Sequence, residues 1–250
     1  MRTRLTLLVA GAISLAACGA PPATGPDTVP EAAEVAAPKP QVQAPANWTA
    51  RGQEPGWLLT IQEGTADFIY DYGAQTYSAL LPEPEVTEGG FSYSDGPGGF
   101  SITSTAKMCA DVATGVPYPD TVTVTLGDEM YQGCGGEPDA LLAGGDWVVS
   151  ELNGVGLIED TQVFMAFDPE AGRVSGRGGC NSYEADYSLG GEGISIGMVT
   201  TTEMACPEDI VVQESQFYEA LRGTSQHGFD ETGALVLTGA QGARIVARKN

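Results

Sequence analysis

Apolar and polar residues alternate with a period of two in many short segments after residue 45, a pattern typical of half-buried β-strands. The clearest case is residues 121–126, in which Val122, Val124 and Leu126 fall on one face. Glycine-rich stretches such as residues 94–99 separate the segments and favour turns. The pattern predicts a mainly β fold of antiparallel strands. Comparable segments lie at residues 68–70, 100–104, 147–152, 162–167, 173–183, 187–189, 193–196, 200–202, 234–238 and 243–248.

One segment departs from this alternation and carries apolar residues at helical spacing, from about residue 207 to 222. Pro207 suits the first helical position, because its missing N–H would have no partner there, and Gly223 offers a stop. Glu214 lies where it can turn toward the apolar face, and a carboxylate there needs an Arg or a backbone N–H partner. We predict one amphipathic helix packed on a sheet. Its apolar face is expected to hold Ile210, Phe217 and Leu221.

The first residues have the order of a secretory signal peptide. Arg2 and Arg4 precede an apolar run, residues 5–17, which is too short to span a bilayer as a helix. The run ends in Leu-Ala-Ala-Cys, which resembles the lipobox of bacterial lipoproteins. That resemblance implies that residues 1–17 are removed and that Cys18 is acylated, with palmitate among its chains. Several acyl chains would anchor the protein stably in a lipid bilayer. The alternative is a soluble secreted protein that is cut nearby.

The residues after the cysteine bear on location and on the next segment. Gly19 takes the place where aspartate would signal retention in the inner membrane, so the same resemblance implies an outer-membrane lipoprotein that faces the periplasm. Residues 18–45 are rich in Pro, Ala and Glu and have few large apolar side chains. Such a segment buries too little surface to offset the entropy of ordering. We predict a disordered tether.

The chain is strongly acidic, with a formal net charge of −22. Removing residues 1–17 takes away two arginines and no acids, which leaves nine basic against 33 acidic residues. Nucleic acid is excluded as a partner, because phosphate binding needs clustered Lys and Arg. A basic envelope protein or a cationic small molecule would complement the charge. The simpler interpretation is that the acidic surface only keeps the protein soluble.

Four cysteines remain beside Cys18, an even number in an oxidising compartment. Three pairings are possible. We expect Cys109–Cys134 and Cys180–Cys206, because this arrangement places one crosslink in each half of the chain. A zinc site is the alternative, but the sequence has no Cys-x-x-Cys and a single histidine, so we expect no metal site.

The first half, residues 46–136, is predicted to be an all-β domain. It begins with Arg51-Gly-Gln-Glu-Pro-Gly-Trp57 and ends with Gly-Cys-Gly-Gly at residues 133–136. These segments resemble a family of bacterial lipoprotein domains with a Gly-x-Glu-Pro-x-Trp entry, which has no established activity. Trp57 and Glu54 are candidate binding residues. The alternative for Trp57 is a core side chain at the start of a strand.

The second half, residues 141–250, carries more specific motifs. They include Gly-Gly-Cys-Asn-Ser-Tyr at residues 178–183 and Met-Ala-Cys-Pro at residues 204–207. In this order the motifs resemble the META domain, also called the HslJ-like domain. The resemblance implies a compact antiparallel β domain with one helix, a link with stress or antibiotic tolerance, and no known catalytic residues. Tyr183 is a third candidate binding residue.

Motifs for catalysis are weak, and we expect neither catalytic residues nor a cofactor. His227 is the sole histidine, no Gly-x-Ser-x-Gly segment accompanies it, and we expect it in an exposed turn. The leading hypothesis is a non-enzymatic envelope lipoprotein that supports stress or antibiotic tolerance through binding. The alternatives are an inhibitor of a basic, lysozyme-type hydrolase, which an acidic domain would attract, and a carboxylate-based peptidoglycan hydrolase.

Overall fold

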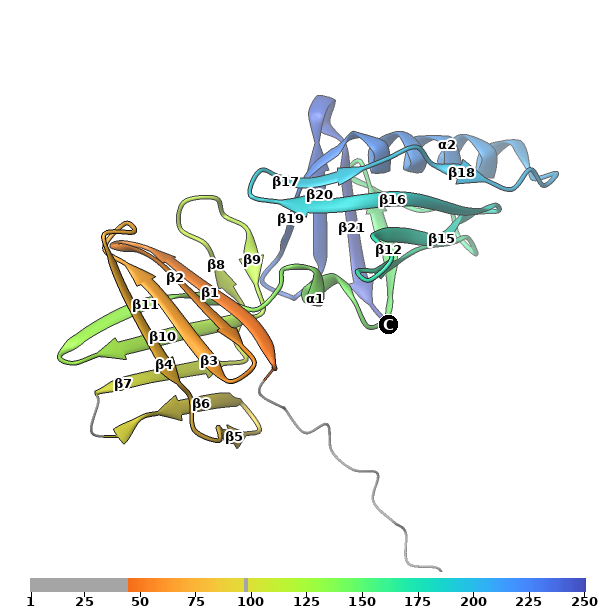
Figure 1. Ribbon diagram of the computed structural model, residues 1–250. Coiled ribbons are helices and arrows are strands. Elements are labelled where there is room, and N and C mark those ends of the chain that lie inside the picture. The colour runs from red at the N-terminus through yellow and green to blue at the C-terminus, as the bar shows by residue number, and fades with distance from the viewer. Residues whose placement is uncertain (1–44, 97–98) are drawn as a thin grey trace, which may run out of the picture. The chain divides into compact units, whose positions relative to one another are not determined.

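The computed structural model describes residues 45–96 and 99–250 (Figure 1). The predicted signal peptide, Cys18 and nearly all of the predicted tether lie outside these residues. Within them the protein is mainly β, as the alternating pattern predicts, and two large antiparallel sheets surround separate hydrophobic cores. No helix in the described ranges combines the length and the apolar character needed to cross a membrane. The domain limits expected from the sequence stay a prediction.

The N-terminal sheet contains nine strands in the order β4-β3-β2-β1-β11-β10-β7-β6-β5. A separate pair, β8 and β9, lies in the segment between β7 and β10. The bounds of these strands are β1 Asn47–Gln53, β2 Gly56–Gln62, β3 Thr65–Tyr70, β4 Gln75–Leu80, β5 Glu85–Thr87, β6 Gly90–Ser94, β7 Phe100–Thr105, β8 Cys109–Ala110, β9 Pro117–Tyr118, β10 Asp120–Leu126 and β11 Glu129–Gly135.

This sheet curls around its own core. Tyr77 on β4 and Phe100 on β7 are far apart in the strand order, yet their ring centroids lie 4.8 Å apart. Val122 and Val124 on β10 are fully buried, as the alternation predicts, and Leu126 is half-buried. The inward-facing side chains of strands that are not neighbours therefore meet in one barrel-like interior.

The C-terminal sheet has the order β17-β16-β15-β14-β12-β21-β20-β19, with β13 paired to β12 and β18 paired to β16. Its two outer strands approach each other, because Gln226 Nε2 on β19 donates to the Glu192 carbonyl beside β17 at 2.9 Å. The strand bounds are β12 Asp146–Leu152, β13 Val155–Gly156, β14 Gln162–Asp168, β15 Arg173–Gly179, β16 Ser182–Gly190, β17 Gly193–Ile196, β18 Thr200–Thr201, β19 Thr224–Phe229, β20 Leu235–Gly239 and β21 Arg244–Lys249.

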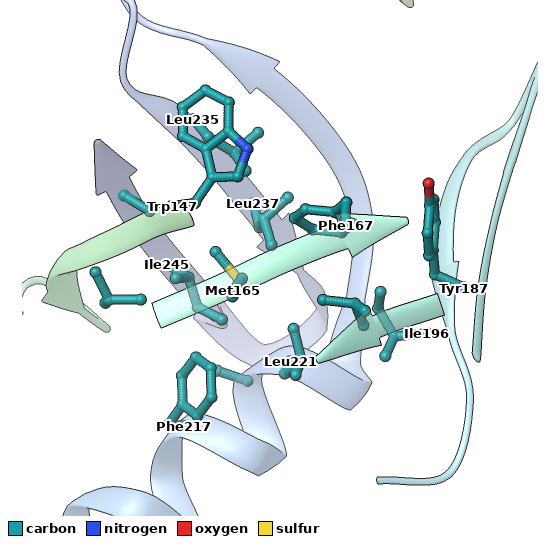
Figure 2. Close-up of a cluster of buried hydrophobic side chains, with 14 of the residues drawn as sticks. Trp147, Met165, Phe167, Tyr187, Ile196, Phe217, Leu221, Leu235, Leu237 and Ile245 are labelled. Atoms are coloured by element: carbon teal, nitrogen blue, oxygen red, sulfur yellow. The ribbon is translucent and has the colours of Figure 1, made fainter. Parts of the chain in front are cut away.

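Helix α2, Glu208–Gly223, packs on the core of this sheet, and a short helix α1, Asp139–Leu142, precedes the first strand. Phe217 and Leu221 are fully buried and extend from α2 toward Met165 and Ile245 (Figure 2). Ile210, expected on the same face, is only half-buried.

The predicted first residue of the helix is wrong by one position. Pro207 has a ψ of 144°, which is extended, so the first helical residue is Glu208. The Pro207 carbonyl accepts the Val211 N–H at 3.1 Å, which makes the proline the N-cap residue. At the other end Gly223 is the last helical residue, and strand β19 begins immediately after it.

Both disulfides in the structure join the pairs expected from the sequence. Cys109–Cys134 connects β8 to β11 with a Cα–Cα distance of 5.4 Å. Cys180–Cys206 connects the β15–β16 turn to the segment before α2 at 6.3 Å. Each closes a loop of about 25 residues, for which the chain-entropy estimate is about 3 kcal/mol of stability.

Candidate functional site

The two motif segments of the N-terminal sheet lie side by side. Strands β1 and β11 are antiparallel neighbours, and Arg51 pairs with Cys134. Trp57 at the start of β2 donates its indole N–H to the Gln132 carbonyl of β11 at 3.2 Å. The turn between β1 and β2 is Glu54-Pro55, with a cis peptide bond. We call this region the motif end of the sheet.

The glycines of the motif end make room for Trp57. A Cβ at Gly52 would lie 2.1 Å from the Trp57 indole nitrogen. A Cβ at Gly133 would lie 2.0 Å from the Arg51 carbonyl oxygen and 2.7 Å from the Trp57 ring. All three distances are far below van der Waals contact, so only glycine fits at either position. The repeated glycines of the two segments are therefore explained by packing.

Trp57 itself is a core side chain, which agrees with the alternative expected from the sequence, and its role as a binding residue stays a prediction. Only 5% of its surface is exposed, its ring packs against Phe68 at 5.8 Å between centroids, and its N–H is already bonded. A ligand would have to open the core to reach it. Glu54, by contrast, is exposed beside the same turn.

One pocket, which we call the disulfide pocket, opens on the Glu54 side of the turn. Its volume is about 530 Å³. Asp111 in its wall is buried and accepts hydrogen bonds from Gln53 Nε2 at 3.0 Å and Thr114 N–H at 2.9 Å. Burial acts to raise the pKa of Asp111, but these hydrogen bonds outweigh it and hold the pKa below the usual value. The pocket is lined by Arg51, Gly52, Gln53, Glu54, Cys109, Ala110, Asp111, Val112, Thr121, Thr123, Gln132, Gly133 and Cys134.

The disulfide pocket offers polar groups of both signs. Arg51 places its guanidinium 5.6 Å from the centre of the Tyr118 ring, a cation–π distance that holds the side chain at the pocket wall. Glu54 adds a carboxylate, and Thr121 and Thr123 add hydroxyl groups. This set suits hydrogen bonding to a polar ligand.

A second pocket, which we call the tyrosine pocket, opens on the Pro55 side of the turn and has a volume of about 600 Å³. Tyr131 donates its hydroxyl to Glu129 Oε2 at 2.6 Å. That hydrogen bond, together with burial, raises the pKa of Tyr131 to about 12, so the phenol stays protonated. The pocket is lined by Pro55, Tyr70, Asp71, Gln75, Leu126, Glu129 and Tyr131.

Sequence reasoning did not identify the tyrosine pocket. Tyr70 ends strand β3 and Asp71 follows it, whereas Glu129 and Tyr131 lie at the start of β11, so the two pairs are almost sixty residues apart. Only the order of the strands brings them together. The available signal was the run Tyr70-Asp-Tyr-Gly73, in which aromatic and acidic residues share a predicted turn.

In the C-terminal sheet, the two cysteine motifs meet at a buried carboxylate. Glu214 on α2 is 4% exposed. Its Oε1 accepts the N–H groups of Asn181 at 2.6 Å and Cys180 at 3.2 Å, and its Oε2 accepts Asn181 Nδ2 at 2.7 Å. Asn181 Oδ1 accepts the Met204 N–H at 2.8 Å. The expected backbone N–H partner of Glu214 is therefore present.

The sequence of this half matches a known family. Residues 140–250 match the family model of the META domain. These residues form a META domain. Among solved structures, an NMR structure of a protein from Burkholderia xenovorans is 22% identical, with a TM-score of 0.39, covering 45% of this chain and 86% of that one. No curated protein matches the chain.

The signature residues of the META domain serve its packing. Glu214, Asn181 and the Cys180–Cys206 disulfide join helix α2 to the β15–β16 turn. A Cβ at Gly178 would lie 2.4 Å from the Tyr218 hydroxyl and 2.9 Å from Glu214 Cγ, so this glycine lets the helix approach the strand. The motifs therefore account for the position of the helix.

Tyr183 is also a core residue of the META domain, and its role as a binding residue stays a prediction. It is 4% exposed, its hydroxyl donates to the Phe164 carbonyl at 3.2 Å, and its ring meets Phe217 at 5.5 Å between centroids. Burial raises its pKa well above the usual value. A ligand would have no route to the ring without displacing the core.

The sequence suggested that His227 lies in an exposed turn, and this prediction is wrong. His227 is on strand β19, is 8% exposed, and neither ring nitrogen has a hydrogen-bond partner among the described residues. Burial lowers its pKa, because the charged form is disfavoured away from water. The strand starts directly after α2 and carries the imidazole inward opposite Leu237.

This burial predicts a pH-dependent stability for the META domain. In the folded state the pKa of His227 lies below its unfolded value near 6.5. Above pH 6.5 the histidine is neutral in both states and does not lower the free energy of unfolding. As the pH drops toward the folded pKa, the unfolded state takes up a proton and the free energy of unfolding falls. We expect the loss in unfolding free energy between pH 7 and pH 5.5 to be smaller in a His227→Leu variant than in the wild type, because leucine has no proton to bind. Denaturant unfolding at both pH values measures it. Parallel pH curves for the two proteins would contradict the prediction.

The described residues contain no group of three or more His, Cys, Asp or Glu side chains placed to hold a metal ion. The two pockets that flank the Glu54-Pro55 turn make the motif end of the N-terminal sheet the candidate site. Of the three binding residues predicted from the sequence, Glu54 alone lies at this surface.

Proposed function

We propose that this protein is a non-enzymatic lipoprotein, anchored in the outer membrane through acylated Cys18, that binds a component of the cell envelope at the motif end of its N-terminal sheet. Through this binding it supports tolerance of stress or antibiotics. The observation that carries the proposal is the pair of pockets on either side of the Glu54-Pro55 turn. The META domain supplies a stable packed unit whose signature residues face its own core.

The chemistry of the region supports binding. A crosslink between β8 and β11 holds one pocket wall, and Asp111 orients the loop beside it through four hydrogen bonds. Walls held in this way lose little conformational entropy when a ligand binds. The exposed carboxylates of Glu54 and Asp71, in the linings of the two pockets, attract basic or cationic partners.

Photo-crosslinking in intact cells tests the proposal. A photoreactive amino acid replaces Glu54, and a matched protein carries it at Glu85, an exposed position on β5 of the same sheet. We expect irradiation to yield a discrete adduct from position 54 and none from position 85, and we expect deletion of the gene to raise sensitivity to envelope stress. Capture of a lysozyme-type hydrolase would favour the inhibitor hypothesis. The absence of an adduct, together with unchanged sensitivity, would refute the proposal.

A further inference from the structure

We propose that the tyrosine pocket binds the ammonium or guanidinium head group of an organic cation. This inference rests on the proposed binding function and names the chemical class of one ligand. The first support is charge. Two carboxylates, Asp71 and Glu129, line the pocket, and none of its seven lining residues is basic. Within the described residues neither carboxylate forms an ion pair with a Lys or Arg side chain.

The charge of the surrounding domain acts in the same direction. Residues 46–136 contain two basic and twelve acidic side chains. One of the two basic residues, Arg51, is held over the Tyr118 ring in the wall of the disulfide pocket. A cation that approaches this domain therefore meets an attractive field, and the tyrosine pocket is a concave place in that field where the cation can settle.

The second support is the arrangement of aromatic rings. Tyr70 and Tyr131 meet edge to face, with centroids 5.6 Å apart and ring planes at 64°. Tyr70 also stacks on Phe68 with ring centroids 5.0 Å apart, which fixes the Tyr70 ring. Tyr70 is half-buried and lines the pocket. Tyr131 is only 5% exposed and supports Tyr70, whose half-buried ring is the one that a cation can reach. An aromatic ring beside carboxylates attracts an organic cation through its negative face.

The third support is the fixed position of the acidic groups. The Tyr131 hydroxyl holds Glu129 at 2.6 Å, which orients that carboxylate at the pocket wall. Asp71 lines the same pocket, which therefore holds a second carboxylate besides Glu129. A metal ion prefers at least three oxygen or nitrogen ligands, whereas two carboxylates beside an aromatic ring suit a larger and more diffuse cation.

The size of the pocket points to a ligand with a chain behind its charged group. A volume of about 600 Å³ exceeds that of a single ammonium head group and admits several methylene groups, which the Pro55 and Leu126 side chains can contact. Two sources share this chemistry. One is a free polyamine, and the other is a basic side chain on a peptide.

Calorimetric titration of the full-length acylated protein in an uncharged detergent tests the inference. The probes are spermidine and trilysine, with Mg²⁺ as a competitor. We expect saturable binding of at least one organic cation that Mg²⁺ at equal concentration does not displace. Binding of spermidine alone would support a free polyamine, and binding of trilysine alone would support a basic peptide.

Variants locate the site. We expect Asp71→Asn and Glu129→Gln each to weaken binding by about three-fold to ten-fold, and Glu85→Gln, the charge-matched control, by less than about two-fold. Asparagine tolerates the positive φ of 52° at position 71, so this change alters charge with little strain. Tyr70→Leu should weaken binding by about three-fold to ten-fold, and Tyr70→Phe should retain it.

Three results would overturn the inference. The first is the absence of saturable binding by both organic cations. The second is displacement of the bound organic cation by Mg²⁺ at equal concentration. The third is a loss of affinity in Glu85→Gln as large as that in Asp71→Asn and Glu129→Gln. The proposed function is tested separately, by crosslinking from position 54 and by deletion of the gene. If position 54 captures an envelope component while neither cation binds, only the cation assignment is wrong. If the cations bind but no adduct forms and deletion of the gene leaves stress sensitivity unchanged, the pocket assignment stands and the proposed function is wrong.

Discussion

Replacing Glu214 with leucine is expected to lower the free energy of unfolding of the META domain by about 3 kcal/mol or more. The carboxylate accepts two backbone N–H groups and the Asn181 amide in a buried setting. Leucine would leave these donors unpaired, and each buried unpaired donor costs about 1 to 3 kcal/mol. Relief of the desolvation of the carboxylate offsets part of this cost. Denaturant unfolding with the disulfides intact measures the difference.

The matched control is Glu219→Leu, an exposed acidic position on the same helix. We expect this change to shift the unfolding free energy by less than about 0.5 kcal/mol. Glu214→Gln should fall between the two, because its amide oxygen still accepts a bond while its NH₂ group opposes a donor. Equal stability of Glu214→Leu and Glu219→Leu would show that the buried network does not hold the helix on the strands.

Replacing Trp57 with alanine is expected to destabilise the N-terminal domain by about 3 to 5 kcal/mol, the range for deleting a large buried aromatic side chain. The indole fills the space above Gly52 and Gly133, and the surrounding strands cannot close over the cavity without breaking their pairing. Trp57→Phe keeps part of the volume but loses the hydrogen bond to Gln132, and we expect a smaller loss. Thermal and denaturant unfolding of the three proteins give the ranking.

A surface control separates packing from ligand binding. Leu80 is highly exposed, and Leu80→Ala should change stability by less than about 0.5 kcal/mol. If Trp57→Ala were equally mild, and if it nonetheless abolished crosslinking from position 54, Trp57 would be a ligand-binding residue and its assignment to the core would be wrong.

Features that depend on local sequence were predictable. The period-two alternation of residues 121–126 specifies the inward face of β10, because successive side chains of a strand point to opposite sides. The apolar spacing around Phe217 and Leu221 specifies the buried face of α2. Glu214 was predictable as a buried carboxylate with a backbone partner, although the sequence did not show that Cys180 and Asn181 supply it.

Features that depend on strand order were not predictable. Tyr70 and Tyr131 meet only because β3, β2, β1 and β11 are successive neighbours in the sheet, and the sequence does not specify that order. His227 looked like a turn residue because glycine and polar residues surround it, yet the strand that follows α2 turns it inward. Trp57 and Tyr183 were ambiguous because an aromatic side chain in a motif serves binding and packing equally well.

The central claim is that the motif end of the N-terminal sheet is the binding surface. Crosslinking from position 54 in intact cells tests this claim most directly. We predict an adduct of defined mass from position 54, containing a component of the cell envelope, and no such adduct from position 85. Adducts of the same composition and yield from both positions would contradict the claim, because they would reflect random encounters with an acidic surface.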